Sequence, residues 1–261
     1  MATNKSVYVD FTSEPPLGIF NSATGITALA ATTTVNGFRT SQGQYFEMYN
    51  DGQNDECVLT GGKITTNGWV PPVDNAADGL EITRGINSAS NAKSVFTVGT
   101  DAAFFIRVGG KIGTIARTTV LTVGFRKLGA YVAIKAADAT TALAAYTDKA
   151  MVGVVAVAGT VATQTSNDNS DVQTSLAATA LVDSRFFSFE VDVSAAGVVT
   201  YKVGQSTTLA LAEAALAADA SAVAFSFDDA EVLVPSIMLV GTAATGINDS
   251  AIHKIEIGYQ S

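Results

Sequence analysis

The segment RFFSFEVDVSAAGVVTYKVG, residues 185–204, alternates apolar and polar side chains with a period of two. The apolar side chains of its first half share one parity: Phe187, Phe189, Val191 and Val193. The polar side chains share the other parity: Ser188, Glu190 and Asp192. This alternation is typical of a strand with one face in a core and the other in water. Gly197 can then adopt a positive φ at little cost and Ser194 can hydrogen-bond nearby backbone, so we predict a β-hairpin.

The composition favours one core with an additional arm over two separate domains. The chain has 261 residues, 48% of them hydrophobic, which is enough for a sizeable core. Its formal net charge is −9 and its basic residues are scattered singly, which argues against a nucleic-acid groove. Only 15% of the residues are charged, against a usual ~25%. The remaining surface of small polar residues suits a protein that is packed among others, or one that is simply soluble.

Cysteine usage and hydropathy indicate folding in a reducing cytosol. Cys57 is the one cysteine, which excludes an intramolecular disulfide, and MATNKSVYVDFTSEPP lacks the apolar run of a signal peptide. A transmembrane helix needs ~18 consecutive apolar residues. Even MVGVVAVAGTVA is short and broken by glycines, so we expect no membrane span.

Residues 1–40 have two interpretations. They contain the strand-like piece SVYVDF, then Pro15 and Pro16, then the Thr/Ala-rich stretch SATGITALAATTTVNGF. One interpretation is an N-terminal arm that reaches a neighbouring molecule, and the other is a first strand followed by a surface loop. Residues 41–261 are predicted to form the sandwich.

Short strand patterns recur at regular spacing along the rest of the chain. Residues 94–134 hold three of them, and residues 151–165 read as a further hairpin. Residues 222–241 and 250–260 close the chain as strands. Many short strands joined by tight turns indicate two antiparallel sheets packed face to face.

Two features modify this β pattern. LALAEAALAADA, residues 209–220, is rich in Ala and Leu without Gly or Pro, which predicts a helix. Pro235 lies within EVLVPSIMLV and cannot donate to a strand ladder, which predicts an edge or a bulge at that position. The predicted fold is all-β: a two-sheet antiparallel jelly-roll sandwich with an N-terminal arm and one or two short helices.

The order of these segments resembles the C-terminal half of concanavalin A-like, or laminin-G-like, jelly rolls. The likeness rests on FFSFEVDVSAAGVVTYKVG, VAFSFDD, VPSIMLV and IHKIEIGYQ, within residues 183–259. It implies the fold more than the function. The chain lacks the loop of paired acidic and Asn ligands, with an aromatic platform, that is expected of sugar-binding members, which argues against lectin activity.

A second set of segments resembles virion proteins of tailed bacteriophages: AAFFIRV, VGFRK, FEVDVSAAGVVTY, FSFDDAEVLVP and IEIGYQ. The resemblance spans most of residues 100–260. It implies an oligomeric, non-enzymatic capsid decoration (cement) protein, or a fibre-like head or tail component. It further implies synthesis in the host bacterial cytoplasm, a place on the capsid surface of the virion, the major capsid protein as partner, and a dimer or trimer of this chain.

In such a role, the low-charge face would be buried across capsomer boundaries while the N-terminal segment adds a strand to a neighbour. The predicted capsid or subunit contacts are Ser6, Val7, Tyr8, Val9, Asp10, Phe11, Thr32, Thr33, Thr34 and Val35. Individually weak contacts become strong when an oligomer engages several at once. Deletion of residues 1–40 is then expected to abolish capsid binding and to leave the sandwich folded.

No catalytic, cofactor-binding or metal-ligating group is predicted from the sequence. His253, the only histidine, shares parity with Ile255 and fits a core or edge residue better than a metal ligand. Asp228, Asp229 and Glu231 could be argued as catalytic carboxylates. Neighbouring residues on a strand face opposite sides, however, so DDAE is more simply a turn.

Further motifs have ordinary structural explanations. NDGQNDE (50–56) and SNDNSDV (166–172) carry enough oxygen ligands for Ca²⁺, but neither follows the EF-hand order and Asx-turns explain both. GGKIGT (109–114) lacks the spacing of a phosphate loop and is interpreted as a turn between strands. Trp69 could stack on a sugar, but a buried anchor under a loop explains it better.

Two other functions stay open. A receptor- or glycan-binding fibre or spike component would use loops such as 50–56 and 66–75, and calcium-dependent binding to bacterial surface polysaccharide would favour it. An enzyme such as a polysaccharide lyase or hydrolase ranks last, because no paired-carboxylate or Tyr/His site can be assembled from the sequence.

Overall fold

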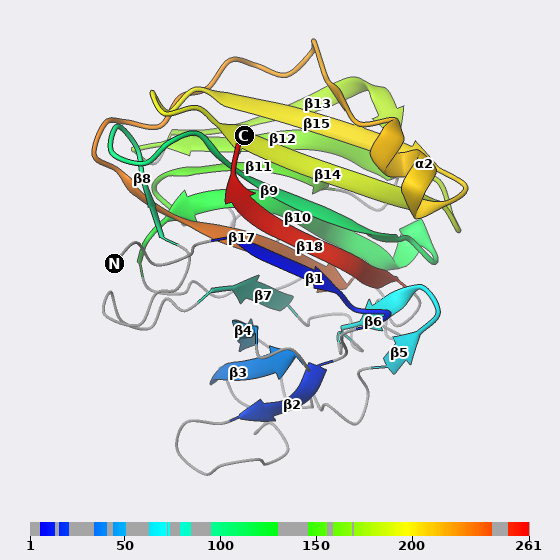
Figure 1. Cartoon of the computed structure of the whole chain (residues 1–261). Coiled ribbons are helices and arrows are strands. Elements are labelled where there is room, and N and C mark those ends of the chain that lie inside the picture. Colours follow the sequence, from blue (N-terminus) through cyan, green and yellow to red (C-terminus); the bar gives the residue numbers. More distant parts are fainter. Residues whose placement is uncertain are drawn as a thin grey trace.

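A computed structural model of the chain is shown in Figure 1. It describes residues 6–13, 16–20, 34–40, 44–50, 63–71, 73, 79–84, 95–129, 146–155, 159–168, 170–241 and 250–260. These residues form two antiparallel sheets, which confirms the all-β, two-sheet sandwich that the alternation predicts. Within this part of the chain, no helix has the length and hydropathy that a membrane crossing requires.

Sheet A has eight strands. In spatial order they are β16 (Ala217–Ala218), β15 (Val199–Ser206), β14 (Phe186–Val193), β9 (Phe104–Lys111), β18 (Ala251–Tyr259), β6 (Gly68–Val70) and β5 (Lys63–Thr65), with β1 (Val7–Asp10) paired to β18. Neighbouring strands therefore come from distant parts of the chain, with β9 lying between β14 and the C-terminal β18.

Sheet B has ten strands. In spatial order they are β13 (Ser170–Ala180), β12 (Thr160–Asn167), β11 (Lys149–Val154), β10 (Thr118–Lys127), β17 (Val232–Gly241), β7 (Gly79–Thr83), β4 (Tyr45–Asn50), β3 (Thr34–Thr40) and β2 (Pro16–Phe20), with β8 (Phe96–Thr97) paired to β17. A 3-10 helix, Ile115–Arg117, leads from β9 in sheet A to β10 in sheet B.

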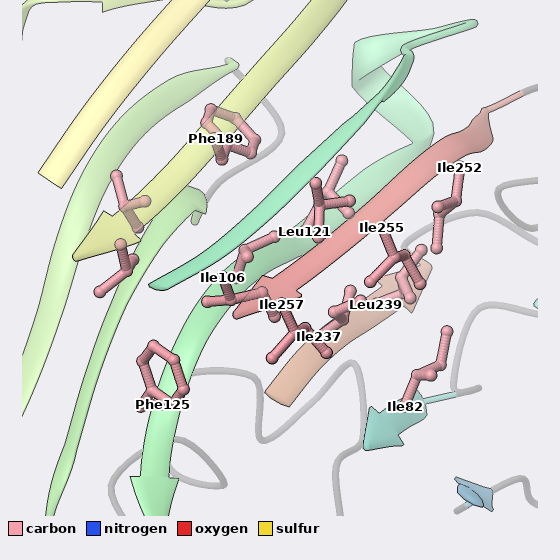
Figure 2. Packing of buried hydrophobic residues seen from close by; sticks show 14 of the residues in the cluster. Ile82, Ile106, Leu121, Phe125, Phe189, Ile237, Leu239, Ile252, Ile255 and Ile257 are labelled. Carbon is pink, nitrogen blue, oxygen red and sulfur yellow. The ribbon is translucent and has the colours of Figure 1, made fainter. Parts of the chain in front are cut away.

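The core lies between the two sheets. Figure 2 shows Ile106 of β9 and Ile257 of β18, from sheet A, close to Phe125 of β10 and Ile237 of β17, from sheet B. The ring of Phe104 lies edge-on to that of Phe125, with centroids 5.0 Å apart. Contacts of this kind across the sandwich join the sheets into one hydrophobic core.

The β14–β15 hairpin forms as predicted, but the polar face of β14 is buried rather than in water. Gly197 has a φ of +84°, and the Ser194 hydroxyl accepts a hydrogen bond from Val198 N at 3.0 Å. However, the polar side chains of β14 belong to buried residues: Ser188 (0% exposed), Glu190 (2%) and Asp192 (7%). Alternation identified the two faces correctly, but what lies over the second face depends on tertiary packing.

The central strands β10, β11 and β17 of sheet B are buried on their outer face as well. Thr122 of β10, Met151 of β11 and Met238 of β17 have the opposite parity to the core residues, and all three are fully buried. Sheet A differs, because side chains such as Lys202 and Tyr8 on its outer face are partly exposed. The outer face of sheet A is therefore more accessible to solvent than that of the central strands of sheet B.

The predicted helix over 209–220 is too long. The helix α2 covers Leu209–Ala214, ends at the C-cap Ala215, and is followed by the short strand β16 against β15. Strand β13 was not predicted, because SDVQTSLAATA alternates too weakly to be recognised. Both differences arise from pairing with neighbouring strands, which the local sequence does not report.

Pro235 occupies a gap in a ladder inside sheet B. It pairs with Phe125 of β10 on one side. On the other side, β8 pairs as far as Leu233 and β7 pairs from Ser236 onward. The proline therefore sits in an interior strand at a position with no recorded pair on that side, which fits the local edge predicted for it.

Two turn predictions have different outcomes. GGKIGT is not a turn throughout, because Gly109, Gly110 and Lys111 belong to β9. DDAE is a turn, and Ala230 within it has a φ of +63°. The first error arises because glycine was taken as a turn signal where it instead allows close packing on a strand.

Candidate functional site

A row of alternating charges crosses the outer face of sheet A. The strand register places Lys202, Glu190, Arg107 and Glu256 side by side on four neighbouring strands. Lys202 Nζ lies 2.6 Å from Glu190 Oε1, and Arg107 Nη1 lies 3.1 Å from Glu256 Oε2. Arg107 Nε also donates to Glu190 Oε2. Each charge therefore faces an opposite charge on the next strand, the favourable cross-strand arrangement.

The row forms part of a shallow depression of about 510 Å³. The eight residues that line it are Phe105, Arg107, Glu190, Asp192, Lys202, Glu256, Tyr259 and Gln260. Asp192 lies one step along β14, and its Oδ2 is 2.6 Å from Lys202 Nζ. Phe105 pairs with Asp192 in the sheet register, which puts an aromatic ring beside the charged groups.

Helix α2 packs on the same face, next to the charged row (Figure 1). Thr208 caps its N-terminus by accepting a hydrogen bond from Leu211 N at 3.3 Å. Glycines allow the helix to approach the sheet: a Cβ on Gly204 would lie 2.1 Å from Ala212 O, and one on Gly109 would lie 2.6 Å from Leu209 Cδ1. The helix thus shields the sheet beside the depression.

Ion pairs favour the ionised forms of three groups in the depression: Glu190, Lys202 and Arg107. Burial raises the pKa of Glu190, but hydrogen bonds from Lys202 and Arg107 outweigh it, and the pKa is lowered overall. Burial likewise opposes the charge of Lys202, yet its hydrogen bonds to Asp192 and Glu190 raise its pKa. Asp192 differs, because burial and the nearby Glu190 charge raise its pKa.

The predicted N-terminal contact residues contribute to the chain's own sandwich. Strand β1 pairs with β18, from Val7 opposite Ile257 to Asp10 opposite Lys254. The side chains that point inward from this segment are core residues: Val7, Val9 and Phe11. Ser6 and Tyr8 are exposed and Asp10 is partly exposed, so these three are the ones that a partner could reach.

The second predicted contact segment lies elsewhere. Thr32 and Thr33 fall outside the described residues. Thr34 and Val35 belong to β3, where they pair with Asn50 and Tyr49 of β4 in sheet B. The two predicted contact segments therefore lie on different sheets.

His253 is displaced from the parity that the sequence suggested. A bulge in β18 lies between Ile252 and Lys254, so residues before and after it no longer share one alternation. The imidazole is partly exposed, and its Nε2 lies 3.7 Å from Asp10 Oδ1. His253 lies on an interior strand beside a carboxylate, and its buried Nδ1 has no hydrogen-bond partner among the described residues.

The structure also locates Trp69 and part of the two loops that carry many oxygen ligands. Trp69 is a buried anchor, as predicted, and its ring centroid lies 5.4 Å from that of Phe11. Loop 50–56 lies outside the described residues except for Asn50, which ends β4. Within 166–172, the chain turns from β12 to β13, and Asp168 N donates to Asp148 at 2.9 Å. No group of acidic, His or Cys side chains suited to a metal ion occurs among the described residues.

Sequence reasoning missed the charged row, although a signal for it exists. The polar residues of β14 and β15, Glu190 and Lys202, are directly opposite in the predicted hairpin. Hairpin register alone could therefore have paired them. Arg107 and Glu256 come from strands 83 and 66 residues distant from Glu190 (190 − 107 = 83; 256 − 190 = 66). Only the sheet order brings them to the same row.

Comparison with known proteins does not assign the chain to a family. No family model matches the chain, and no curated protein matches it. Solved structures with some similarity include a protein of unknown function from Shewanella oneidensis MR-1, with 13% identity, a TM-score of 0.34 and coverage of 69% of this chain and 68% of that one.

Two further solved structures are similar at the same low level. One is the binding domain of botulinum neurotoxin DC in complex with SialylT, with 8% identity, a TM-score of 0.40, and coverage of 86% of this chain and 46% of that one. The other is a carbohydrate esterase from the Shiga toxin-encoding bacteriophage phi24B, with 8% identity, a TM-score of 0.33, and coverage of 95% and 100%. The chain thus spans about half the length of the neurotoxin domain. Similarities this distant leave the function to be argued from the site itself.

Proposed function

We propose that this chain is a non-enzymatic binding protein whose depression on sheet A holds a polar ligand, with a glycan as the ligand class. The observation that carries the proposal is the charge row beside Phe105. Its donors and acceptors are fixed in place by pairing across strands, and an aromatic ring lies next to them. Fixed polar groups beside an aromatic surface suit a ligand with many hydroxyls and an apolar face.

Binding is favoured over acid–base catalysis by the ionisation of these groups. A general acid or base works best when its pKa lies near the working pH. Here the ion pairs move the pKa of Glu190 down and those of Lys202 and Arg107 up. Asp192 is the exception, because burial and the Glu190 charge raise its pKa overall despite the Lys202 ammonium 2.6 Å away. The partly exposed side chains of Lys202, Arg107 and Glu256 are the ones that a neutral ligand can reach.

The test is a screen of bacterial surface polysaccharides with the wild-type chain and two phenylalanine variants. Phe105→Ala removes the ring in the depression. Phe186→Ala removes a ring from the outer face of the adjacent strand, outside the depression, where it lies against Lys111. We expect binding that is weakened by Phe105→Ala and unchanged by Phe186→Ala.

Calcium should not be required, because the carboxylates in the depression are already paired with Lys202 and Arg107. A screen without any bound glycan, with and without Ca²⁺, would overturn the proposal. If Phe105→Ala and Phe186→Ala lost glycan binding equally, the assignment of the binding site to the depression would be overturned.

A second candidate function is the capsid decoration role that the sequence resemblance implies. One observation favours it: in the described part of the chain, no strand pairs with the edge of β1 that faces away from β18. A free edge can accept or add a strand across a subunit boundary. Tyr8, 54% exposed, lies on this strand and could contact the major capsid protein or a second copy in a dimer or trimer.

Two measurements test this candidate. Quantitative mass spectrometry of purified virions should find this chain in hundreds of copies if it decorates the capsid surface, and its absence would contradict the proposal. In a sedimentation assay with expanded capsids, Tyr8→Asp should reduce binding. Thr200→Asp, an exposed position on the distant β15 of the same sheet, should not. Equal binding of wild type and Tyr8→Asp would exclude β1 as the contact.

A further inference from the structure

Three charged residues meet at one end of sheet B. Lys127 ends β10, Asp148 directly precedes β11, and Glu231 directly precedes β17. Lys127 Nζ lies 2.8 Å from Asp148 Oδ2 and 3.3 Å from Glu231 Oε1. Both carboxylate side chains are only 4% exposed, whereas the lysine is 49% exposed. A single ammonium therefore serves two buried carboxylates.

Backbone hydrogen bonds converge on the same place. Lys127 N donates to Asp148 O at 2.9 Å, and Leu128 N donates to Val232 O at 2.8 Å. Asp168 N, in the turn between β12 and β13, donates to Asp148 Oδ1 at 2.9 Å. The three side chains thus lie where the last residues of β10 and β12 meet the first residues of β11 and β17. A depression of about 480 Å³ opens beside them.

Further acidic side chains lie on the turns around these three residues. The turn that carries Glu231 adds Asp228 and Asp229, both exposed. The turn between β12 and β13 adds Asp168. The turn after β8 is joined to this region because Val98 N donates to Glu231 O at 3.0 Å, but the Asp101 carboxylate of that turn accepts from Thr97 N and the Tyr259 hydroxyl instead. Among the described residues, Lys127 is the cation that pairs with both Asp148 and Glu231, so one positive charge faces two buried carboxylates.

The two buried carboxylates respond differently to this imbalance. Burial raises the pKa of Glu231 to about 7, and the Asp148 charge adds to the rise while Lys127 only partly opposes it. The buried Oε1 of Glu231 accepts no hydrogen bond from the described residues. Burial also opposes the charge of Asp148, but hydrogen bonds from Lys127 and Asp168 N leave its pKa lowered. A proton taken up by the pair therefore resides on Glu231.

We propose that Lys127, Asp148 and Glu231 form a pH-sensitive latch, which holds the 228–231 turn against the ends of β10 and β11 while Glu231 is protonated and loosens when it ionises. A protonated Glu231 is a hydrogen-bond donor and leaves Lys127 and Asp148 as a balanced pair. An ionised Glu231 places two like charges in a buried site. Because its folded-state pKa lies above its ordinary value, its stabilisation is present in acid and is lost as the pH rises through the folded-state pKa.

The test is hydrogen exchange of the full chain, read as protection factors corrected for intrinsic rate, at about pH 5.5 and about pH 8.5. The relevant amides are those of Leu128, Asp168 and Ala230, each hydrogen-bonded at the latch. We expect their protection to fall about tenfold or more at the higher pH. Amides in the β14–β15 hairpin serve as an internal reference and should keep their protection.

Two matched variants distinguish the latch from general pH effects. Glu231→Gln stays neutral and should keep the latch amides protected at both pH values. Glu213→Gln removes a glutamate of α2 that pairs with Lys254 at 2.7 Å, and it should retain the wild-type response. Constant protection in the wild type, or an unchanged pH response in Glu231→Gln, would overturn the proposal.

A direct titration decides the matter should Glu231→Gln fail to fold. The carboxyl ¹³C shift of Glu231 in the wild-type chain should have a midpoint within about one unit of neutrality. A midpoint near that of an exposed glutamate would overturn the latch.

Discussion

Arg126 of β10 and Glu81 of β7 form an ion pair from which water is excluded: Nε lies 2.6 Å from Oε1, and both side chains are 0% exposed. Strand β17 lies between the two, and its Ser236 hydroxyl donates to the same carboxylate oxygen at 2.7 Å. Tyr146 donates to the other oxygen, and its ring centroid lies 4.2 Å from Arg126 Cζ. This network ties three strands together on the outer face of sheet B.

Removal of one partner should be costly. Arg126→Met leaves the Glu81 carboxylate buried without its cation, and we expect a loss of about 3–5 kcal/mol in the free energy of unfolding. Urea denaturation checks this, with the exposed Arg185→Met as a control that should change stability by less than about 0.5 kcal/mol. The double variant Arg126→Met/Glu81→Leu should recover part of the loss. If Arg126→Met were as stable as the control Arg185→Met, this view of the network would be contradicted.

The close approach of α2 to sheet A gives a second prediction. In Gly204→Ala, the new Cβ would lie 2.1 Å from a backbone oxygen of the helix, so α2 must shift. We expect a cost of about 1–3 kcal/mol and faster proteolysis within Leu209–Ala214. Gly129→Ala is the matched control, because a Cβ there meets no atom within 4 Å. Thermal unfolding compares the two, and an unaffected Gly204→Ala would show that α2 is not held against the sheet.

The N-terminal strand should be needed for folding. Phe11 is 0% exposed and packs on Trp69, so Phe11→Ala should cost about 3–5 kcal/mol. Tyr8→Ala, three residues earlier and 54% exposed, should have little effect. For the same reason, we expect deletion of residues 1–40 to destabilise the sandwich, in contrast to the expectation from sequence. Chemical denaturation of the three variants measures this, and a stable deletion variant would restore the arm interpretation.

Acid should weaken sheet A through Glu190. Its pKa in the folded chain is lowered from the ordinary value of 4.5, so its ion pairs stabilise the fold above that value. This contribution is lost as the pH falls through the folded-state pKa. Urea unfolding at a series of acidic pH values should show a shallower decline for Glu190→Gln than for the wild type. The free energy of unfolding of Glu213→Gln should fall with pH about as that of the wild type does. An equal fall in all three proteins would refute the role of Glu190.

The elements with strong alternation were predictable from the sequence, and those without it were not. The β14–β15 hairpin has a period of two and a turn residue at Gly197, so both its strands and its turn follow from local chemistry. Strand β13 lacks the period, and its eleven residues are ordered by pairing with β12. The helix was predicted from Ala and Leu content, but it ends at the C-cap Ala215, and Ala217 and Ala218 pair with β15 instead.

By itself, the sequence determined the fold class, the parity of the core residues and the buried role of Trp69, because these depend on side-chain period and hydrophobicity. Only the tertiary structure decided which polar residues meet. Arg107 reaches Glu190 and Glu256, and Lys127 reaches Asp148 and Glu231, through strand order that joins distant segments. The bulge at His253 likewise interrupts the alternation of β18, so the parity of Ile255 and Ile257 does not extend to the residues before it. Local periodicity specifies the face of each side chain, whereas its neighbours on that face are specified by long-range pairing of strands.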